Sequence, residues 1–257
     1  ITSSVTNYQG NGNIVIDGGI WEGNSIAFYQ SFNALEIGVG DNIKIINCTF
    51  TDVVRAHAVD LSACRNVWIE NNKFLGYATF RTSPDGYGTT TDGLSDDRTY
   101  VEAIQLDHHV TGSFNFGALD GTPCVNVFFN NNVIGPNPAR SDNTFTSWGA
   151  GIGAHGAVND RYQQNIIVEG NTFTDCIYAG VRAFKWVGLT VASNVFRGCV
   201  RCVHVTPVTW NFVSANNPDG SASGQGQAGS DYTITGNTFK DYTDIGVFFT
   251  APTSFNV

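Results

Sequence analysis

The amino-acid sequence predicts an all-β fold, a right-handed parallel β-helix (a solenoid) of about seven to eight coils with loop insertions. A short phrase of alternating apolar residues returns along the chain, and most copies end in an asparagine and an aromatic residue. Charged residues make up only 14% of the chain, and no helix-forming Lys/Glu/Ala/Leu stretch is present. Self-similarity at a period of about 20–50 residues is typical of solenoids. Two short strands per repeat without a helix favour a β-helix over helical or leucine-rich repeats.

The repeated phrase contains two apolar residues one position apart, a turn, and then a large apolar residue. In successive copies the large residue is Trp21, Phe50, Phe74, Ile134, Phe173, Phe196 and Phe239. The intervals are 29, 24, 60, 39, 23 and 43 residues, which fit a base period of 23–24 residues with insertions. We expect the aromatic rings to stack inside the solenoid. We expect the turn asparagines to adopt left-handed backbone and to hydrogen-bond from coil to coil.

A second strand in each repeat has a small first residue and apolar second and fourth residues. Its copies span residues 34–38, 58–62, 103–107, 151–155, 180–184, 202–206 and 246–250. Because strand side chains alternate between faces, the third and fifth positions should point outward. The third-position column is Glu36, Asp60, Gln105, Gly153, Arg182, His204 and Phe248, and the fifth is Gly38, Ser62, Asp107, His155, Phe184, Thr206 and Thr250. We call these two columns the outward stripe.

The outward stripe has acids toward its N-terminal coils and bases toward its C-terminal coils, unlike a randomly mixed solvated surface. Adjacent strands lie ~4.8 Å apart, so Glu36 should contact Asp60, and Asp107 should contact His155. The diagonal from Asp60 to Asp107 would be roughly 8 Å, which suits an inverting glycosidase that needs room for water. Gly153 would leave a gap in the middle of the stripe.

This arrangement favours a polysaccharide-degrading enzyme of the glycoside hydrolase type, with Asp60 and Asp107 as the acid/base pair. Glu36 and Glu102 would be tuning or alternate carboxylates, and His155, Arg182 and His204 would hold the substrate. The enzyme alternative is a lyase that cleaves a uronate-containing glycan by β-elimination, with His155 or Arg182 taking the proton. The alternative from another class is a non-catalytic adhesin or structural phage-tail protein that only binds sugar. A purely structural role is a further alternative: the charged side chains would pair along the sheet only to fix the register of its strands. The candidate substrate-binding residues include Glu36, Gln105, His108, Lys185, Trp186, His204 and Trp148.

Charge and composition exclude several classes of partner. The net charge of −9 argues against nucleic acid and anionic membrane, either of which requires a basic face. No apolar run approaches the ~20 residues of a membrane span.

The six cysteines lack zinc-site spacing. Cys176 and Cys199 are predicted to form a buried thiol pair, and a disulfide is the alternative. No cofactor or metal is predicted, although calcium at the acidic loop of Asp92, Asp96 and Asp97 stays open.

Extra residues collect in four insertions, at about 77–101, 108–123, 137–149 with 156–163, and 207–230. Each enters or leaves the strands of the outward stripe, and loops gathered on one side of a solenoid usually wall a binding face. The repeat resumes after every insertion, so residues 1–257 are expected to form a single β-helix domain. Since the chain begins with Ile1 and contains no methionine, we expect a processed product or part of a longer chain.

Several phrases of the chain carry a resemblance to a known superfamily. They are residues 102–107, 121–127, 151–155 and 180–183, together with the Asn-x-Phe turns. On these residues the sequence resembles the pectate-lyase-like right-handed parallel β-helix superfamily, in particular the β-helix proteins of phage tailspikes and Gram-positive cell surfaces. The resemblance implies an extracellular or virion-borne homotrimer that acts on polysaccharide. The chain lacks the calcium-site acid triad and the Arg-Pro-x-x-Arg motif of pectate lyases, so calcium-dependent pectate cleavage is not expected.

Overall fold

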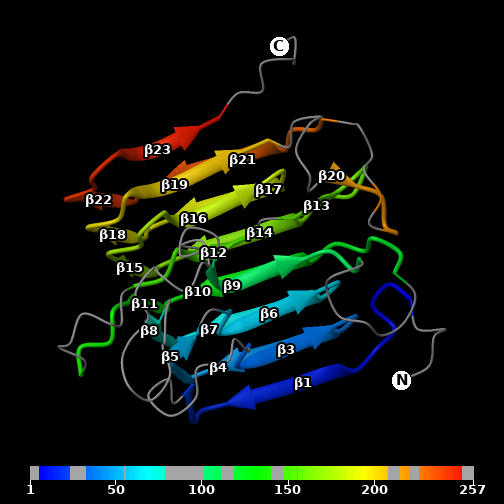
Figure 1. The fold of residues 1–257 in the computed structure, drawn as a ribbon, viewed down its shortest axis with the longest axis horizontal. Helices are drawn as coiled ribbons and strands as arrows, with labels where there is room; N and C mark the ends of the chain where they lie inside the picture. The colour runs from blue at the N-terminus through cyan, green and yellow to red at the C-terminus, as the bar shows by residue number, and fades with distance from the viewer. Residues whose placement is uncertain are drawn as a thin grey trace, which may run out of the picture.

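The computed structural model describes residues 6–23, 33–54, 56–78, 101–110, 119–139, 147–154, 156–207, 215–219, 221 and 226–250. Within these residues the chain forms three parallel sheets of seven strands each and one sheet of two strands. Each coil contributes one strand to each large sheet, and Figure 1 shows the coils stacked from β1 (blue) to β23 (red). This arrangement confirms the predicted right-handed parallel β-helix, with seven coils.

The three large sheets are named A, B and C. Sheet A contains β1 (Gly12–Asp17), β4 (Asp41–Ile46), β7 (Arg65–Glu70), β10 (Val125–Asn130), β14 (Gln164–Glu169), β17 (Val187–Ala192) and β21 (Ser230–Thr235). Sheet B contains β2 (Ile20–Glu22), β5 (Thr49–Val54), β8 (Lys73–Ala78), β11 (Val133–Gly135), β15 (Thr172–Thr174), β18 (Val195–Arg197) and β22 (Thr238–Lys240). Sheet C contains β3 (Leu35–Gly38), β6 (Val59–Ser62), β9 (Glu102–Asp107), β12 (Ala150–Gly153), β16 (Ala179–Phe184), β19 (Arg201–Thr206) and β23 (Ile245–Phe249). The small sheet pairs β13 (Ala157–Val158) with β20 (Ala215–Asn216).

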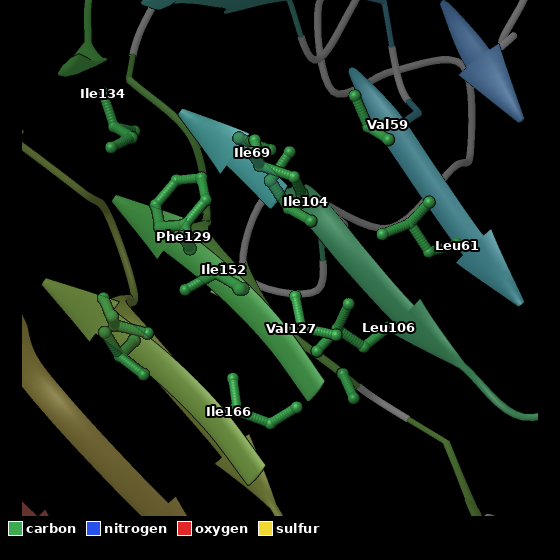
Figure 2. Close-up of a cluster of buried hydrophobic side chains, with 14 of the residues drawn as sticks. Val59, Leu61, Ile69, Ile104, Leu106, Val127, Phe129, Ile134, Ile152 and Ile166 are labelled. Atoms are coloured by element: carbon green, nitrogen blue, oxygen red, sulfur yellow. The ribbon is translucent and has the colours of Figure 1, made fainter. Parts of the chain in front are cut away.

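The core fills the space between the sheets with the alternating apolar residues of both repeated phrases. Figure 2 shows Ile104 and Leu106 of sheet C among Val127 and Phe129 of sheet A, all of them fully buried. Burying each such side chain contributes roughly 1.5–3 kcal/mol relative to leaving it in water. The alternation in the sequence therefore decides which face of each strand turns inward.

The predicted aromatic stack runs through the interior, and its one aliphatic position is bridged from another strand. Neighbouring ring centroids lie 5.9 Å apart for Trp21–Phe50, 5.2 Å for Phe50–Phe74, 4.7 Å for Phe173–Phe196 and 5.4 Å for Phe196–Phe239. Beside Ile134, the ring of Phe129 from β10 lies 6.0 Å from Phe74 and 6.2 Å from Phe173.

The same stack explains why the first residue of the second phrase is small. A Cβ atom on Gly151 would lie 2.3 Å from Phe173 Cε1, and one on Gly180 would lie 2.5 Å from Phe196 Cε1. Such contacts are far inside van der Waals distance, so the aromatic column admits only small residues beside it. This position therefore faces inward, and the residue before it faces out.

The turn asparagines form the predicted ladder inside the coils. Each Nδ2 donates to the Oδ1 of the next: 3.1 Å for Asn72–Asn132, 3.0 Å for Asn132–Asn171, 2.9 Å for Asn171–Asn194 and 3.0 Å for Asn194–Asn237. Each Oδ1 also accepts a backbone N–H of the preceding coil, and each Nδ2 also donates to a backbone carbonyl. The ladder thereby satisfies buried backbone groups that the turns leave without strand partners.

The backbone expectation for these asparagines is wrong by one residue. The left-handed position is the residue before the ladder asparagine, for example Asn71 at φ 58° and Asn131 at φ 55°. A second asparagine ladder, which was not predicted from the sequence, lies on the outer side of sheet A, again at positive φ. Asn165 donates to Asn126, Asn126 to Asn66 and Asn66 to Asp41, and a separate bond joins Asn42 to Asn13. Asparagine is among the residues that tolerate this conformation best, so it suits these turn positions.

All six cysteines are buried free thiols, as the favoured prediction had it. Cys176 and Cys199 lie in adjacent coils and hydrogen-bond to each other. Burial raises the pKa of Cys64 and of Cys202 to about 12. Because the thiolate is the reactive form, these side chains act as small core residues.

Candidate functional site

The strand register of sheet C aligns the third-position column of the outward stripe as predicted. The third-position column pairs in the order Glu36, Asp60, Gln105, Gly153, Arg182, His204 and Phe248. Ser62 pairs with Asp107, so Asp60 and Asp107 are diagonal neighbours on β6 and β9. His155 lies outside the described residues, and its expected contact with Asp107 stays a prediction.

Most polar side chains of the outward stripe are buried rather than open to solvent. The exposed fraction is 9% for Asp60, 4% for Gln105, 4% for Arg182 and 5% for His204. Asp107 is half-buried, and in the third-position column Glu36 is exposed. The middle of the outward stripe on sheet C is therefore shielded from solvent.

A fully buried carboxylate, Glu102, lies beside the centre of the stripe. Its Oε1 is 3.4 Å from Arg182 Nη1, and its Oε2 is 3.6 Å from His57 Nδ1. The expected gap at Gly153 is filled, because a Cβ there would lie 2.9 Å from both Glu102 Cγ and Arg182 Cβ. The missing side chain makes room for the contact between Glu102 and Arg182, and not for a ligand.

Asn33 joins the two acids at the N-terminal end of the stripe. Its Nδ2 donates to Glu36 Oε1 at 2.8 Å and to Asp60 Oδ2 at 3.0 Å, and its Oδ1 accepts the backbone N–H of His57 at 2.9 Å. A shared amide donor reduces the repulsion between neighbouring carboxylates. Asn33 was not predicted from the sequence. The signal that could have found it is its position directly before the small first residue of its strand, which His57 and Glu102 also occupy in their strands.

The C-terminal end of the stripe interleaves arginines with aromatic rings. The Arg182 guanidinium lies 5.1 Å from the Tyr178 ring centroid, and Arg201 lies 5.1 Å from Tyr178 and 5.1 Å from Phe248. Cation–π contacts of this kind stabilise a desolvated guanidinium. Arg182 is therefore held within the protein by Glu102 and by Tyr178.

His204 and His108 are neutral bases in the folded protein. Burial, with Arg201 and Arg182 nearby, lowers the pKa of His204 to about 4, and its Nε2 is 2.9 Å from Thr250 Oγ1. Burial, with Lys185 nearby, lowers the pKa of His108 to about 3, and its Nδ1 is 3.2 Å from Gln163 Nε2. At neutral pH neither ring carries the positive charge that would hold a uronate.

Three other candidate substrate-binding side chains are engaged inside the protein. Trp148 and Trp186 are fully buried in the hydrophobic core, and Trp148 Nε1 donates to the Phe74 carbonyl at 3.3 Å. Lys185 is 2% exposed, and its ammonium donates to the Val158 carbonyl and to Gln227 Oε1. As placed, neither indole offers a ring face to a sugar, and Lys185 bonds β13 rather than a ligand.

The buried Lys185 predicts a stability that rises with pH. Burial lowers its pKa from 10.5 to about 8, so between these values the unfolded chain binds more protons than the native protein. In that window the free energy of unfolding gains up to roughly 2–3 kcal/mol from this residue. Urea unfolding at pH 7.5 and pH 10 should show this gain in the wild type and not in Lys185→Met, which keeps every other titrating group. Equal pH slopes would contradict the prediction.

The described residues hold no group of three or more His, Cys, Asp or Glu side chains that could bind a metal ion. The acidic loop of Asp92, Asp96 and Asp97 lies outside them, so calcium there stays untested. Among the described residues, a helix with the length and apolar character of a membrane span is absent.

Comparison with known proteins finds a streptococcal surface protein. No protein-family model matches the chain. The chain is 28% identical over 174 residues to the plasmin and fibronectin-binding protein A of Streptococcus pneumoniae (strain ATCC BAA-255 / R6), a match that covers 67% of this chain and 22% of that protein. The chain thus spans about a fifth of the length of this curated relative.

Two solved structures share the fold. A crystal structure of PfbA, a surface adhesin of Streptococcus pneumoniae, superposes with a TM-score of 0.64 at 19% identity, over 90% of this chain and 58% of that one. A second structure of the Streptococcus pneumoniae surface protein and adhesin PfbA gives a TM-score of 0.52 at 19% identity, over 83% and 68% of the two chains. At this identity the likeness establishes the parallel β-helix and not the function.

Proposed function

We propose that this chain is the β-helical binding region of a bacterial cell-surface adhesin, which binds an extracellular host protein and cleaves no substrate. The similarity to a protein named for binding plasmin and fibronectin covers two thirds of the chain and supports this proposal. It favours the non-catalytic adhesin alternative over the glycoside hydrolase predicted from the sequence, and it points to a protein ligand where that alternative expected a sugar.

The observation that carries the proposal is the burial of the polar side chains in the middle of the outward stripe. An inverting glycosidase needs two carboxyl groups that reach both substrate and water. Here Glu102 has no exposed surface and faces Arg182, while Asp60 is 9% exposed and accepts a hydrogen bond from Asn33. A face that is filled by its own ion pair and amide contacts is better suited to holding the coils together than to acid–base chemistry.

The test is direct binding. The purified chain should bind immobilised plasmin or fibronectin with a dissociation constant of roughly micromolar or tighter, the range of specific protein complexes, and should not bind immobilised albumin. Biolayer interferometry gives the constant and both rates. Absence of binding to both proteins would overturn the proposal.

A second candidate, glycan hydrolysis, is favoured by one observation. Asp60 and Asp107 occupy diagonal positions on β6 and β9, and Asp107 is partly exposed. Incubation with a panel of bacterial surface polysaccharides, followed by mass spectrometry, would show new reducing ends for a hydrolase and unsaturated sugars for a lyase. A hydrolase should lose at least ~100-fold of its rate in Asp107→Asn, and a variant that cleaves as fast as the wild type would eliminate this assignment.

The homotrimer, the polysaccharide partner and the virion location rest on the phage-tail resemblance and stay predictions.

A further inference from the structure

The outer face of sheet A carries an apolar column that the core does not use. Successive strands contribute Val15, Lys44, Trp68, Phe128, Ile167, Thr190 and Thr233. Val15 is 61% exposed, and the side chains of Trp68, Phe128 and Ile167 are each half-buried. Trp68, Phe128 and Ile167 occupy adjacent strands and form a contiguous apolar patch, from which Lys44 separates Val15. Apolar surface patches mark interaction sites more often than chance. We call this column the sheet A stripe.

The Trp68 ring in the sheet A stripe presents its edge, and not its faces, to the outside. Phe128 stacks on one face of Trp68, with centroids 5.5 Å apart and planes 11° apart. Lys44 Nζ lies 5.5 Å from the centroid of the Trp68 ring, and it comes from β4, on the side of β7 opposite to β10. Both faces of the indole are therefore covered. A sugar stacks on an open ring face, whereas the apolar side chains of a protein pack against ring edges, so this geometry favours a protein as the partner.

Acids border the sheet A stripe on one side. The neighbouring outward column contains Asp17, Glu70 and Glu169, and its described residues include no lysine or arginine. It lies about 7 Å from the stripe, the spacing of alternate residues on a strand. On the other side lies the outer asparagine ladder, whose amides hydrogen-bond to one another from coil to coil. The patch thus has an apolar centre, an amide border and an acidic border.

We infer that the sheet A stripe, centred on Trp68 and Phe128, is the surface on which a folded protein partner docks, and that the partner presents an apolar patch bordered by lysine or arginine. This inference rests on the proposed function and names the surface for it. Aromatic side chains at the centre of an interface supply most of its binding energy. A charged border sets the association rate and the choice of partner.

The experiment compares variants of the full chain on immobilised plasmin and fibronectin. Trp68→Ala and Phe128→Ala should each weaken binding at least tenfold, mainly through faster dissociation. The double variant Glu70→Gln/Glu169→Gln should associate several-fold more slowly at low salt and at the wild-type rate at 0.5 M salt, because salt screens exposed charges. Val133→Ala and Glu22→Gln, on the outer face of sheet B, are the matched controls and should bind as the wild type does.

The outcomes separate this inference from the proposed function. If the Trp68, Phe128 and glutamate variants all bind as tightly and as fast as the wild type, the sheet A stripe is not the docking surface. The proposed function is unaffected by that result. A wild type that binds neither protein overturns both. Thermal melting checks the fold of each variant, and if the Trp68 variant does not fold, the surface glutamate variant decides by its salt-dependent association. Loss of binding to a bacterial polysaccharide, with protein binding unchanged, would overturn the assignment to a protein partner.

Discussion

Asn171→Ala is expected to lower the free energy of unfolding by roughly 3–5 kcal/mol, because it opens the middle of the buried asparagine ladder. The Asn171 side chain makes four hydrogen bonds, two accepted from Asn132 and two donated, to the Phe129 carbonyl and to Asn194 Oδ1. Alanine leaves the Asn132 N–H and the Phe129 carbonyl in the interior without these partners. Each buried polar group left without a hydrogen-bond partner lowers the free energy of unfolding by ~1–3 kcal/mol.

Asn237→Ala is the matched control for the ladder. Asn237 closes the same ladder at the last coil and makes the same kind of contacts, but its side chain is partly exposed, so water replaces the lost hydrogen bonds. We expect a loss near 1 kcal/mol for this variant. Urea unfolding of both proteins measures the difference, and equal losses would show that burial does not govern the ladder's contribution.

The fold could be predicted from the sequence because its inward positions repeat without error. Pairs such as Ile104 and Leu106 recur in every coil of sheet C, and a slip by one residue would turn each of them to the outside. The left-handed turn residue was misplaced for a physical reason. The ladder asparagine must turn its amide inward toward carbonyls of neighbouring coils, so the residue before it, such as Asn71 or Asn131, takes the positive φ.

The columns of the site could also be predicted, but their exposure could not. Register follows from aligning the phrases, whereas burial depends on side chains from outside the aligned columns. Glu102 stands one residue before the phrase, yet it fills the space at Gly153 and pairs with Arg182. Asn33 stands at the corresponding position and bridges two acids. Trp148 looked like a sugar platform because nothing local in the sequence distinguishes a core indole from a surface one.

Arg182→Met is expected to destabilise the protein by about 3 kcal/mol, since it removes the guanidinium from a carboxylate that has no exposed surface. The double variant Glu102→Gln/Arg182→Met should recover a large part of this loss, because it removes both charges together. A double-mutant cycle measured by urea unfolding isolates the coupling between the two side chains, expected at about 1 kcal/mol or more, within the range for contacting residues. A coupling near zero would contradict the structural role of this pair.

The control for this cycle is a second arginine on the same sheet. Arg201 pairs with Asp244 at 2.8 Å, but the side chains are 23% and 40% exposed, and exposed ion pairs contribute only ~0–1 kcal/mol. Arg201→Met should therefore lower the free energy of unfolding far less than Arg182→Met does.

The role of Glu102 also bears on function. A catalytic Glu102 would tolerate glutamine in the fold and lose activity, whereas a structural Glu102 loses stability in Glu102→Gln and leaves protein binding at the sheet A stripe unchanged wherever the variant is folded.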